Sequence, residues 1–164
     1  MTRMIPLGPR ALPALVDDED YDRVVAAGPW HASKRGATYY ARHNERKPEG
    51  GYRSYSMHQI VLDPSPGLEI DHINGDGLDN RRGNLRAATR SQNNANRNKR
   101  SSATSSRFKG VIFVPAHWEA NINAQGRQHY LGRFDSEEAA ARAYDEAAVM
   151  LHGEYAKVNF PEVM

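Results

Sequence analysis

A carboxylate and an imidazole stand side by side at Asp71 and His72, directly after residues 68–70 (LEI). The alternation in LEI predicts a strand, and the following loop 74–77 (NGDG) is made of turn-forming residues. Neighbours on a strand point to opposite faces, but at a strand end bordering a glycine-rich loop both can reach one site. The pair is therefore either a turn with a hydrogen-bonded histidine or a catalytic pair. The chain has no cysteine, so any metal here is held by oxygen or imidazole.

Two asparagines follow at fixed distances from this pair. Asn84 lies 12 residues after His72 and opens the next element, and Asn93 lies 9 residues after Asn84. A polar helix is expected from Thr89 to about Arg97, with Asn93 on the face that packs against the hairpin. A single asparagine is ordinary in loops and helix caps, so the joint spacing is what carries information.

Taken together, residues 56–98 resemble the HNH (ββα-metal) nucleases, in particular the phage and intron homing-endonuclease branch in which the last histidine is replaced by asparagine. The resemblance implies that Asp71 and Asn93 supply oxygen ligands to one divalent cation per active site, Mg²⁺ first and Mn²⁺ second. It implies that His72 is the general base that activates water. Asn84 would tie the loop of the motif and orient the histidine.

The same resemblance suggests residues around the scissile phosphate. Arg81, Arg82 and Arg86 would hold phosphates near the cut, and His58 is an accessory residue that could face the site. Residues 71–110 contain nine basic and three acidic side chains, a balance of +6, whereas residues 1–70 are balanced and residues 111–164 carry −4. This concentration predicts a DNA-contacting segment, and a solvated basic linker is the alternative. The further basic residues expected to contact DNA are Arg90, Arg97, Lys99 and Arg100.

The composition limits the class of protein and its cellular location. Of the 164 residues, 39% are hydrophobic and 26% charged, and no apolar stretch is long enough to span a bilayer. The N-terminal stretch has no uninterrupted apolar run and does not resemble a secretory signal. We expect an intracellular protein of a prokaryote or a phage-infected host, with no membrane partner. The oligomeric state is left open by the sequence, and a monomer is favoured.

The chain is expected to divide at the Ser-rich stretch 101–106 (SSATSS), which is typical of a linker. A nuclease unit would occupy residues 1–100 and a second unit residues 107–164. In the first unit we expect a helix over 17–27, a hairpin of strands 38–42 and 52–57, and a helical turn over 58–62. Residues 1–55 carry no chemical motif and resemble the strand-rich leader of phage proteins of this kind.

The second unit has a clear pattern. Residues 108–114, 117–124 and 127–134 predict three antiparallel strands joined by turns at 115–116 and 125–126. Asp135 and Glu138 fit a capping box, and alanines at helical spacing then continue to Gly153. The alanine-rich face would let this helix lie close against the sheet. The predicted fold class is α+β: a ββα-metal unit with a strand-rich leader, and a three-stranded antiparallel sheet backed by one helix.

Residues 107–161 resemble the plant ethylene-response-factor or AP-two domain in the pattern FKGV, WEANI, LGRFDSEEAAARAYDEAA and GEYAKVNFP. The resemblance implies a sheet laid in the DNA major groove and a helix behind it. For Trp118 and Tyr130, packing on the small sheet remains an equal alternative. This chain has Ile112 and Asn123 where the plant domains usually have arginine, so their target sequence is not transferred. The positions expected to face DNA are Lys109, Trp118, Asn121, Asn123, Arg127, Tyr130 and Arg133.

We therefore expect a metal-dependent DNA endonuclease of the mobile or homing kind that nicks or cuts duplex DNA at a site selected by its C-terminal domain. The alternative is a sequence-specific DNA-binding regulator with an inactive nuclease domain. An RNA-directed nuclease is disfavoured, because the A-form major groove is too narrow for strands.

Overall fold

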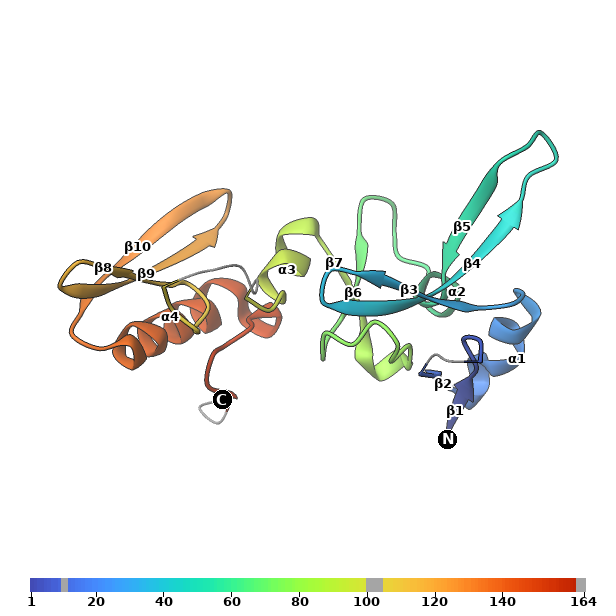
Figure 1. Ribbon diagram of the computed structural model, residues 1–164, viewed down its shortest axis with the longest axis horizontal. Helices are drawn as coiled ribbons and strands as arrows, with labels where there is room; N and C mark the ends of the chain where they lie inside the picture. Colours follow the sequence, from blue (N-terminus) through green and yellow to red (C-terminus); the bar gives the residue numbers. More distant parts are fainter. Residues whose placement is uncertain (10–11, 100–104, 162–164) are drawn as a thin grey trace. The chain divides into compact units, whose positions relative to one another are not determined.

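The computed structural model describes residues 1–9, 12–99 and 105–161, and the chain forms two compact units, Met1–Thr89 and Arg90–Met164. Each unit combines antiparallel sheets with helices, which confirms the α+β class (Figure 1). Helix α3 (Arg90–Ala95) groups with the second unit. Residues 101–104 of the Ser-rich stretch, where the sequence places the linker, lie outside the described residues.

Three small antiparallel sheets lie in the described part of the first unit. The predicted helix, hairpin and helical turn are present, with bounds within a few residues of those expected. The strands before residue 38 were not individually predicted. The elements in chain order are β1 (Thr2–Ile5), β2 (Ala14–Asp17), α1 (Asp18–Ala26), β3 (His31–Arg35), β4 (Thr38–Arg46), β5 (Tyr52–Ser56), α2 (Met57–Val61), β6 (Glu69–His72), a 3₁₀ turn (Arg82–Asn84) and β7 (Leu85–Ala88). In the sheets, β1 pairs with β2, β3 and β5 flank β4, and β6 pairs with β7.

One hydrophobic core joins these elements. Val16 of β2, Val24 of α1, Met57 and Val61 of α2, and Leu85 of β7 are all buried in it. Burying each such side chain contributes about 1.5–3 kcal/mol relative to leaving it exposed. The leader therefore forms one folded body with the strands that carry Asp71 and His72.

The loop between β6 and β7 is fastened to the leader by backbone hydrogen bonds. The N–H of Leu15 in β2 donates to the Leu78 carbonyl at 2.8 Å, and the Asn80 N–H donates to the Leu15 carbonyl at 2.8 Å. These bonds surround a parallel bridge between Leu15 and Asp79. The loop therefore has a fixed conformation, although it contains no regular element of its own before Arg82.

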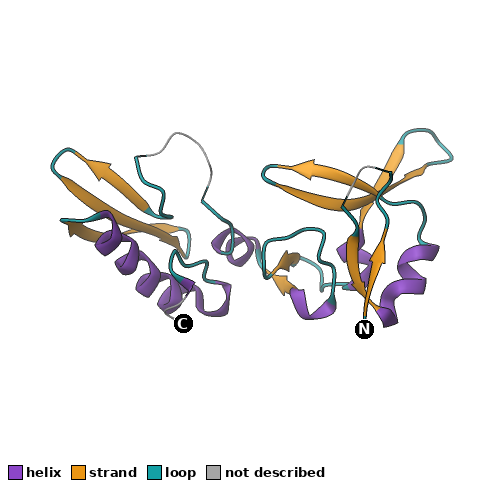
Figure 2. Cartoon of the chain, turned by 60° about the horizontal axis from the view of Figure 1, so that its bottom comes forward, coloured by secondary structure: helices purple, strands orange, loops and turns teal. Residues whose placement is uncertain are grey.

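The second unit holds a three-stranded meander with a helix on one face (Figure 2). Strands β8 (Val111–Val114), β9 (His117–Ala124) and β10 (Arg127–Phe134) lie in the order β10-β9-β8, and helix α4 (Glu137–His152) is followed by a 3₁₀ turn at Gly153–Tyr155. The turn at Gln125 and Gly126 has positive φ at both residues, 52° and 74°, as a type I′ hairpin turn requires. The predicted meander is confirmed.

Two details differ from expectation. The first strand begins at Val111 rather than residue 108, because Gly110 has a φ of 76° and lies so close to the Tyr144 ring that a Cβ there would be 1.9 Å from Cδ2. The capping box of Asp135 and Glu138 is wrong. The helix is capped by Ser136, whose hydroxyl accepts the Ala139 N–H at 3.2 Å.

Small side chains allow close contact between α4 and the sheet. Ala140 and Ala148 of α4 are fully buried, and Ala120 and Ile122 of β9 are buried opposite the helix. The predicted alanine-rich contact face is therefore present. Since residues alternate along a strand, the other face of the sheet is turned away from α4.

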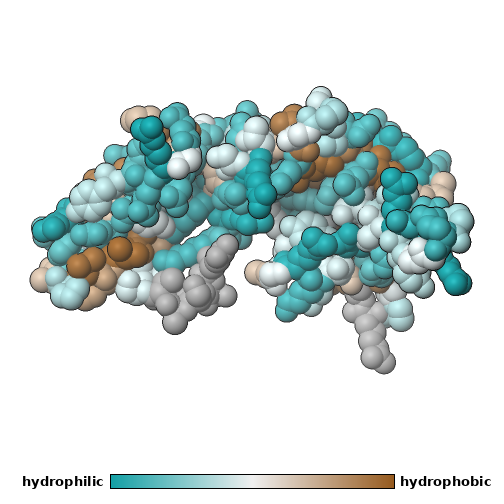
Figure 3. Space-filling model, turned by 90° about the horizontal axis from the view of Figure 1, so that it is seen from above, coloured by the Kyte–Doolittle hydropathy of each residue, from teal (hydrophilic) through white to brown (hydrophobic). Residues whose placement is uncertain are grey.

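The surface drawn in Figure 3 is mainly hydrophilic, with hydrophobic atoms in a few separate patches. Within the part of the chain that the structure describes, no helix has the length and apolar character needed for a membrane span.

Candidate functional site

Asp71 and His72 end strand β6, and both side chains are nearly inaccessible, at 4% and 6% exposure. They face different partners. Asp71 lies opposite Arg86 on β7, whose Nε and terminal nitrogen are each 2.9 Å from Asp71 Oδ2. His72 turns to the other side of β6, toward rings of the leader. Such an alternation is what a strand imposes on adjacent residues.

The His72 imidazole lies among two other rings. Its centroid is 5.1 Å from that of His58 in α2 and 5.8 Å from that of Tyr40 in β4, both in edge-to-face geometry. His58 and Tyr40 also contact each other, at 6.1 Å. The accessory residue expected from sequence, His58, is thus beside His72. Tyr40 was not anticipated, because nothing in a tyrosine-rich strand marks which ring will reach a residue 32 positions later.

Burial decides the protonation of both histidines. Burial, together with the neighbouring His72 and Arg42, lowers the pKa of His58 to about 3. It also lowers the pKa of His72, although a hydrogen bond with Asn80 and the charge of Asp71 oppose this. Both imidazoles are therefore neutral at neutral pH. A neutral imidazole has one nitrogen with a free lone pair and can accept a proton.

Asn80 determines which nitrogen of the His72 imidazole can accept a proton. Asn80 is fully buried, and its Nδ2 donates to the Leu78 carbonyl at 3.1 Å, which turns its Oδ1 toward His72. Oδ1 is 3.4 Å from His72 Nε2 and can only accept, so Nε2 carries the hydrogen and Nδ1 is the basic nitrogen. The orienting role was expected of Asn84, and Asn80 was not anticipated. A buried asparagine in a polar loop gives no signal in a single sequence.

Asn84 ties the loop together. Its Oδ1 accepts the Asn74 N–H at 3.0 Å, its Nδ2 donates to Asn74 Oδ1 at 3.0 Å and to the Asp79 carbonyl at 2.8 Å, and its carbonyl accepts the Ile73 N–H at 2.9 Å. This network closes the loop directly after His72. Any catalytic effect of Asn84 stays a prediction.

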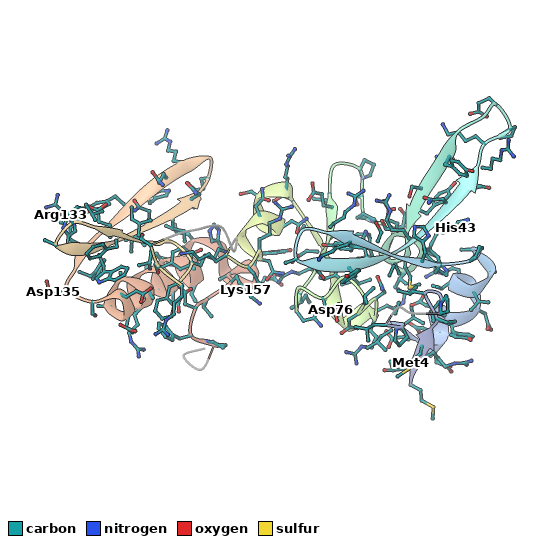
Figure 4. The ribbon with its side chains drawn as sticks, in the orientation of Figure 1. Met4, His43, Asp76, Arg133, Asp135 and Lys157 are labelled. Carbon is teal, nitrogen blue, oxygen red and sulfur yellow. The ribbon has the colours of Figure 1, made fainter. Side chains whose placement is uncertain are left out.

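The loop also packs tightly against the leader at Gly77. A Cβ at this position would lie 2.5 Å from the Tyr39 carbonyl and 2.6 Å from the Tyr40 ring. Only glycine permits this approach. Asp76, on the same loop (Figure 4), accepts the Leu78 N–H at 2.9 Å and supports the turn.

The arginines expected to hold phosphates are engaged with carboxylates. Arg81 forks onto Asp79 with both distances at 2.7 Å, which holds the pKa of Asp79 below its usual range. Arg82 forks onto Asp20 of α1 at 2.7 and 2.9 Å. With Arg86 on Asp71, all three guanidinium groups have internal partners. Their contact with phosphate stays a prediction.

A divalent cation near His72 would need oxygen or imidazole ligands, since the chain has no cysteine. Among residues 1–9, 12–99 and 105–161, no group of three or more histidine or carboxylate side chains is arranged to hold a metal. Mg²⁺ commonly binds one or two protein oxygens and fills its other positions with water and substrate phosphate, so the buried Asp71 carboxylate fits such an ion. Asn93, the second expected ligand, lies on α3 in the second unit. Their sharing of one ion stays a prediction.

The outer face of the second unit's sheet carries part of the expected DNA contacts. Asn121 pairs with Tyr130 across β9 and β10, and Tyr130 is 56% exposed. Asn123 lies two residues further along the same face. Arg133, labelled in Figure 4, pairs with Glu119 on this face, and its side chain is 71% exposed.

Three residues expected to face DNA do not lie on the outer face of the sheet. Trp118 packs on the helix side against the Phe113 ring at 4.9 Å and the buried core, which favours the packing interpretation. Lys109 is drawn inward, where its Nζ donates to the Ala95 carbonyl at the end of α3. Arg127 pairs with Ala124 at the hairpin end, on the side that faces α4. Of the other expected contacts, Arg90 is in α3, Arg97 and Lys99 follow it, and Arg100 lies outside the described residues.

Comparison with known proteins supports both resemblances. Residues 64–95 match the HNH endonuclease family. The uncharacterized HNH endonuclease L560 of Acanthamoeba polyphaga mimivirus is 36% identical over 93 residues, which is 56% of this chain and 47% of that protein. HNH nucleases generally use a divalent metal ion.

The second similarity is to plant regulators. The AP2-like ethylene-responsive transcription factor TOE2 of Arabidopsis thaliana is 50% identical over 58 residues, and APETALA2-like protein 2 of Oryza sativa subsp. indica is 48% identical over 58 residues, each match covering 34% of this chain. The chain spans 12–13% of the length of these plant proteins and less than half of the mimiviral one. The chain thus joins an HNH endonuclease-type segment to an AP2-like domain.

Proposed function

We propose that the chain is a DNA endonuclease that hydrolyses a phosphodiester bond with a divalent cation, Mg²⁺ before Mn²⁺, at a site selected by the AP2-like domain. The observation that carries the proposal is the state of His72. Within the HNH-matching segment this imidazole is neutral, buried and held with Nδ1 as its basic nitrogen. A general base must be unprotonated at the working pH and must direct its basic nitrogen at the water, and the neutral state of His72 meets the first requirement.

The reaction then follows from the residues on β6 and its loop. His72 Nδ1 takes a proton from a water molecule as the water oxygen attacks phosphorus, and the bond from phosphorus to the leaving 3′ oxygen breaks. Asn80 keeps the proton on Nε2 and so disfavours the other tautomer, in which Nδ1 would carry the proton. Tyr40 and His58 pack edge-to-face on the ring and fix its plane. A divalent cation held through Asp71 and Asn93 would stabilise negative charge on the phosphate and the leaving oxygen.

DNA selection is assigned to the outer face of the second unit's sheet. Asn121, Asn123 and Tyr130 offer amide and phenol groups, and Arg133 adds a guanidinium group. A sheet fits the major groove, which is about 12 Å wide. Because this face has one arginine among the four, fewer bidentate guanine contacts are available, and we propose a long and loosely read target site.

We further propose a mobile or homing-type enzyme that acts on duplex DNA inside a prokaryotic or phage-infected cell and works as a monomer. The cut is either a nick or a double-strand break.

A DNA-binding regulator is the second candidate. The plant proteins similar to this chain are transcription factors by name, so the AP2-like domain by itself is equally compatible with regulation. The buried His72, oriented by Asn80, favours the nuclease, because a regulator would not need a neutral and oriented base in the segment that matches the HNH endonucleases.

Supercoiled plasmid is the substrate for the deciding experiment. The parent, His72→Ala and the control His31→Ala, which removes an exposed histidine on β3 of the same unit, are incubated with and without Mg²⁺. We expect nicked or linear product with parent and His31→Ala in Mg²⁺ and none with His72→Ala. If all three bind DNA but none converts the plasmid, the regulator is correct. Equal conversion by His72→Ala would refute the assignment of the base.

A further inference from the structure

A basic pocket in the second unit is not used by the function proposed above. It has a volume of about 400 Å³ and lies where the chain enters β8 and where it returns after α4. Four cationic side chains and two asparagines share its lining: Asn98, Lys99, Arg107, Lys109, Lys157 and Asn159. No carboxylate belongs to this lining among the described residues. Figure 4 labels Lys157 on the segment that follows α4.

The lysines line the same pocket, and Glu137 is an acidic side chain whose charge acts on Lys99. Lys99 Nζ donates to the Phe108 carbonyl at 2.6 Å, and Lys109 Nζ donates to the Ala95 carbonyl. Lys157 has no ion-pair partner within the described part of the chain. Burial lowers the pKa of Lys99, and burial together with the charge of Lys157 lowers the pKa of Lys109 to about 8. Like charges gathered this way are stabilised by a bound anion.

The nearby acidic groups are directed to other partners. Glu137 accepts the Arg107 N–H at 3.0 Å, and Glu138 pairs with the Arg107 guanidinium at 3.0 Å. Asp145 accepts from the Asn159 side chain at 3.0 Å. Arg107 is thus already neutralised, although Glu137 still attracts Lys99. The uncompensated positive charge in the pocket comes mainly from the lysines.

We infer that this pocket binds a phosphate of the DNA backbone, as a contact separate from the outer face of the sheet. The inference rests on the proposed function. DNA is favoured over a small anion because three of the four cationic side chains belong to the basic segment 71–110, whose balance is +6, and because ammonium groups bind phosphates as point charges without requiring a base or sugar. Such a contact adds affinity without sequence preference.

The test measures duplex binding by fluorescence anisotropy at several salt concentrations. The full chain carries His72→Ala so that DNA is not cut, and it is compared with added Lys157→Gln, with added Lys99→Gln and with the control Lys47→Gln, which removes a first-unit lysine paired with Glu49. Losing one phosphate contact reduces the salt slope of log K by about 0.9 and raises Kd about eightfold at 0.1 M salt. We expect this for each pocket variant on every sequence, with no change for Lys47→Gln. Lys157→Arg should keep the parental slope.

Each contrary outcome is distinct. If the parent does not bind duplex DNA, the proposed function fails and the inference with it. If the parent binds and the pocket variants, folded by circular dichroism, keep its slope, the inference alone is refuted. Inorganic phosphate is the second probe: if it raises the melting temperature of the parent but not of Lys157→Gln while the DNA slopes stay equal, the pocket binds a small anion and the DNA assignment is overturned.

Discussion

Arg82 offers a direct test of whether a basic residue in the connection between β6 and β7 contacts DNA or stabilises the fold. The Arg82 guanidinium donates to the Asp20 carboxylate through Nε at 2.7 Å and a terminal nitrogen at 2.9 Å. The Asp20 side chain is 2% exposed. Replacing Arg82 with Gln would leave this buried carboxylate with Arg23 as its remaining partner. We therefore expect Arg82→Gln to destabilise the first unit.

The loss in the free energy of unfolding follows from how deeply each partner of the ion pair is buried. Removing one member of a fully buried ion pair costs about 3–5 kcal/mol. Arg82 is 43% exposed and Arg23 stays on Asp20, so solvent and the second arginine reduce the loss to about 2 kcal/mol. For a unit of this size, that lowers the melting temperature by about 10 °C.

The measurement uses the two tryptophans, one in each unit. In a Trp118→Phe background, fluorescence of the buried Trp30 reports unfolding of the first unit alone. Arg3→Gln is the matched control, because Arg3 pairs with Asp18 of the same helix at 3.0 Å where both side chains are half exposed and stacks on the Tyr21 ring at 3.7 Å, and we expect a smaller loss than for Arg82→Gln. DNA affinity is measured on the same samples below their melting temperatures. If Arg82→Gln melts like the parent but loses DNA affinity, the structural role is refuted and the phosphate contact is correct.

Three further outcomes are expected. Asn80→Leu removes the acceptor for His72 Nε2 and should lower the cleavage rate constant about tenfold or more with little change in DNA affinity, whereas an equal loss of affinity would show general misfolding. His58 has a folded pKa of about 3 against 6.5 when unfolded, so the unfolded chain binds more protons between these two values. The free energy of unfolding should therefore fall by up to about 1.4 kcal/mol per pH unit as the pH drops below 6.5. Denaturant titrations from pH 4 to 8 would contradict this if His58→Gln showed the same dependence of stability on pH as the parent. Gly110→Ala places a methyl group 1.9 Å from the Tyr144 ring and should abolish folding of the second unit, so retention of parental DNA affinity would disprove that packing.

Local signals were sufficient for much of the second unit. Its strands are bounded by a two-residue turn at Gln125 and Gly126, and its helix repeats alanine at helical spacing, so neighbours in sequence decide the structure. The helix cap shows the limit of this reasoning. Asp135 and Ser136 are both good capping residues, and the backbone at Ser136, not a sequence preference, decides which one caps.

The surroundings of the site could not be predicted, because they are formed by residues far apart in sequence. Adjacent Asp71 and His72 were identified from their types and from the strand before them, whereas Tyr40 reaches His72 across 32 positions and Arg82 reaches Asp20 across 62. From the count of basic residues, the Arg82 guanidinium was expected to bind phosphate. A single sequence cannot show that its charge is already matched by a carboxylate on another element.

The backbone bonds between Leu15 and the loop at 78–80 bear on whether the nuclease segment is a portable cassette. Residues 64–95, grafted into another scaffold, would take His72 and Asn84 along but leave behind the strand that fastens the loop, the ring of Tyr40 and the carboxylate of Asp20. A designer who wished to attach the proposed cleavage activity to a different DNA reader would therefore need to move the chain from its first strand through α3, so that Asn93, the second proposed metal ligand, moves together with Asp71.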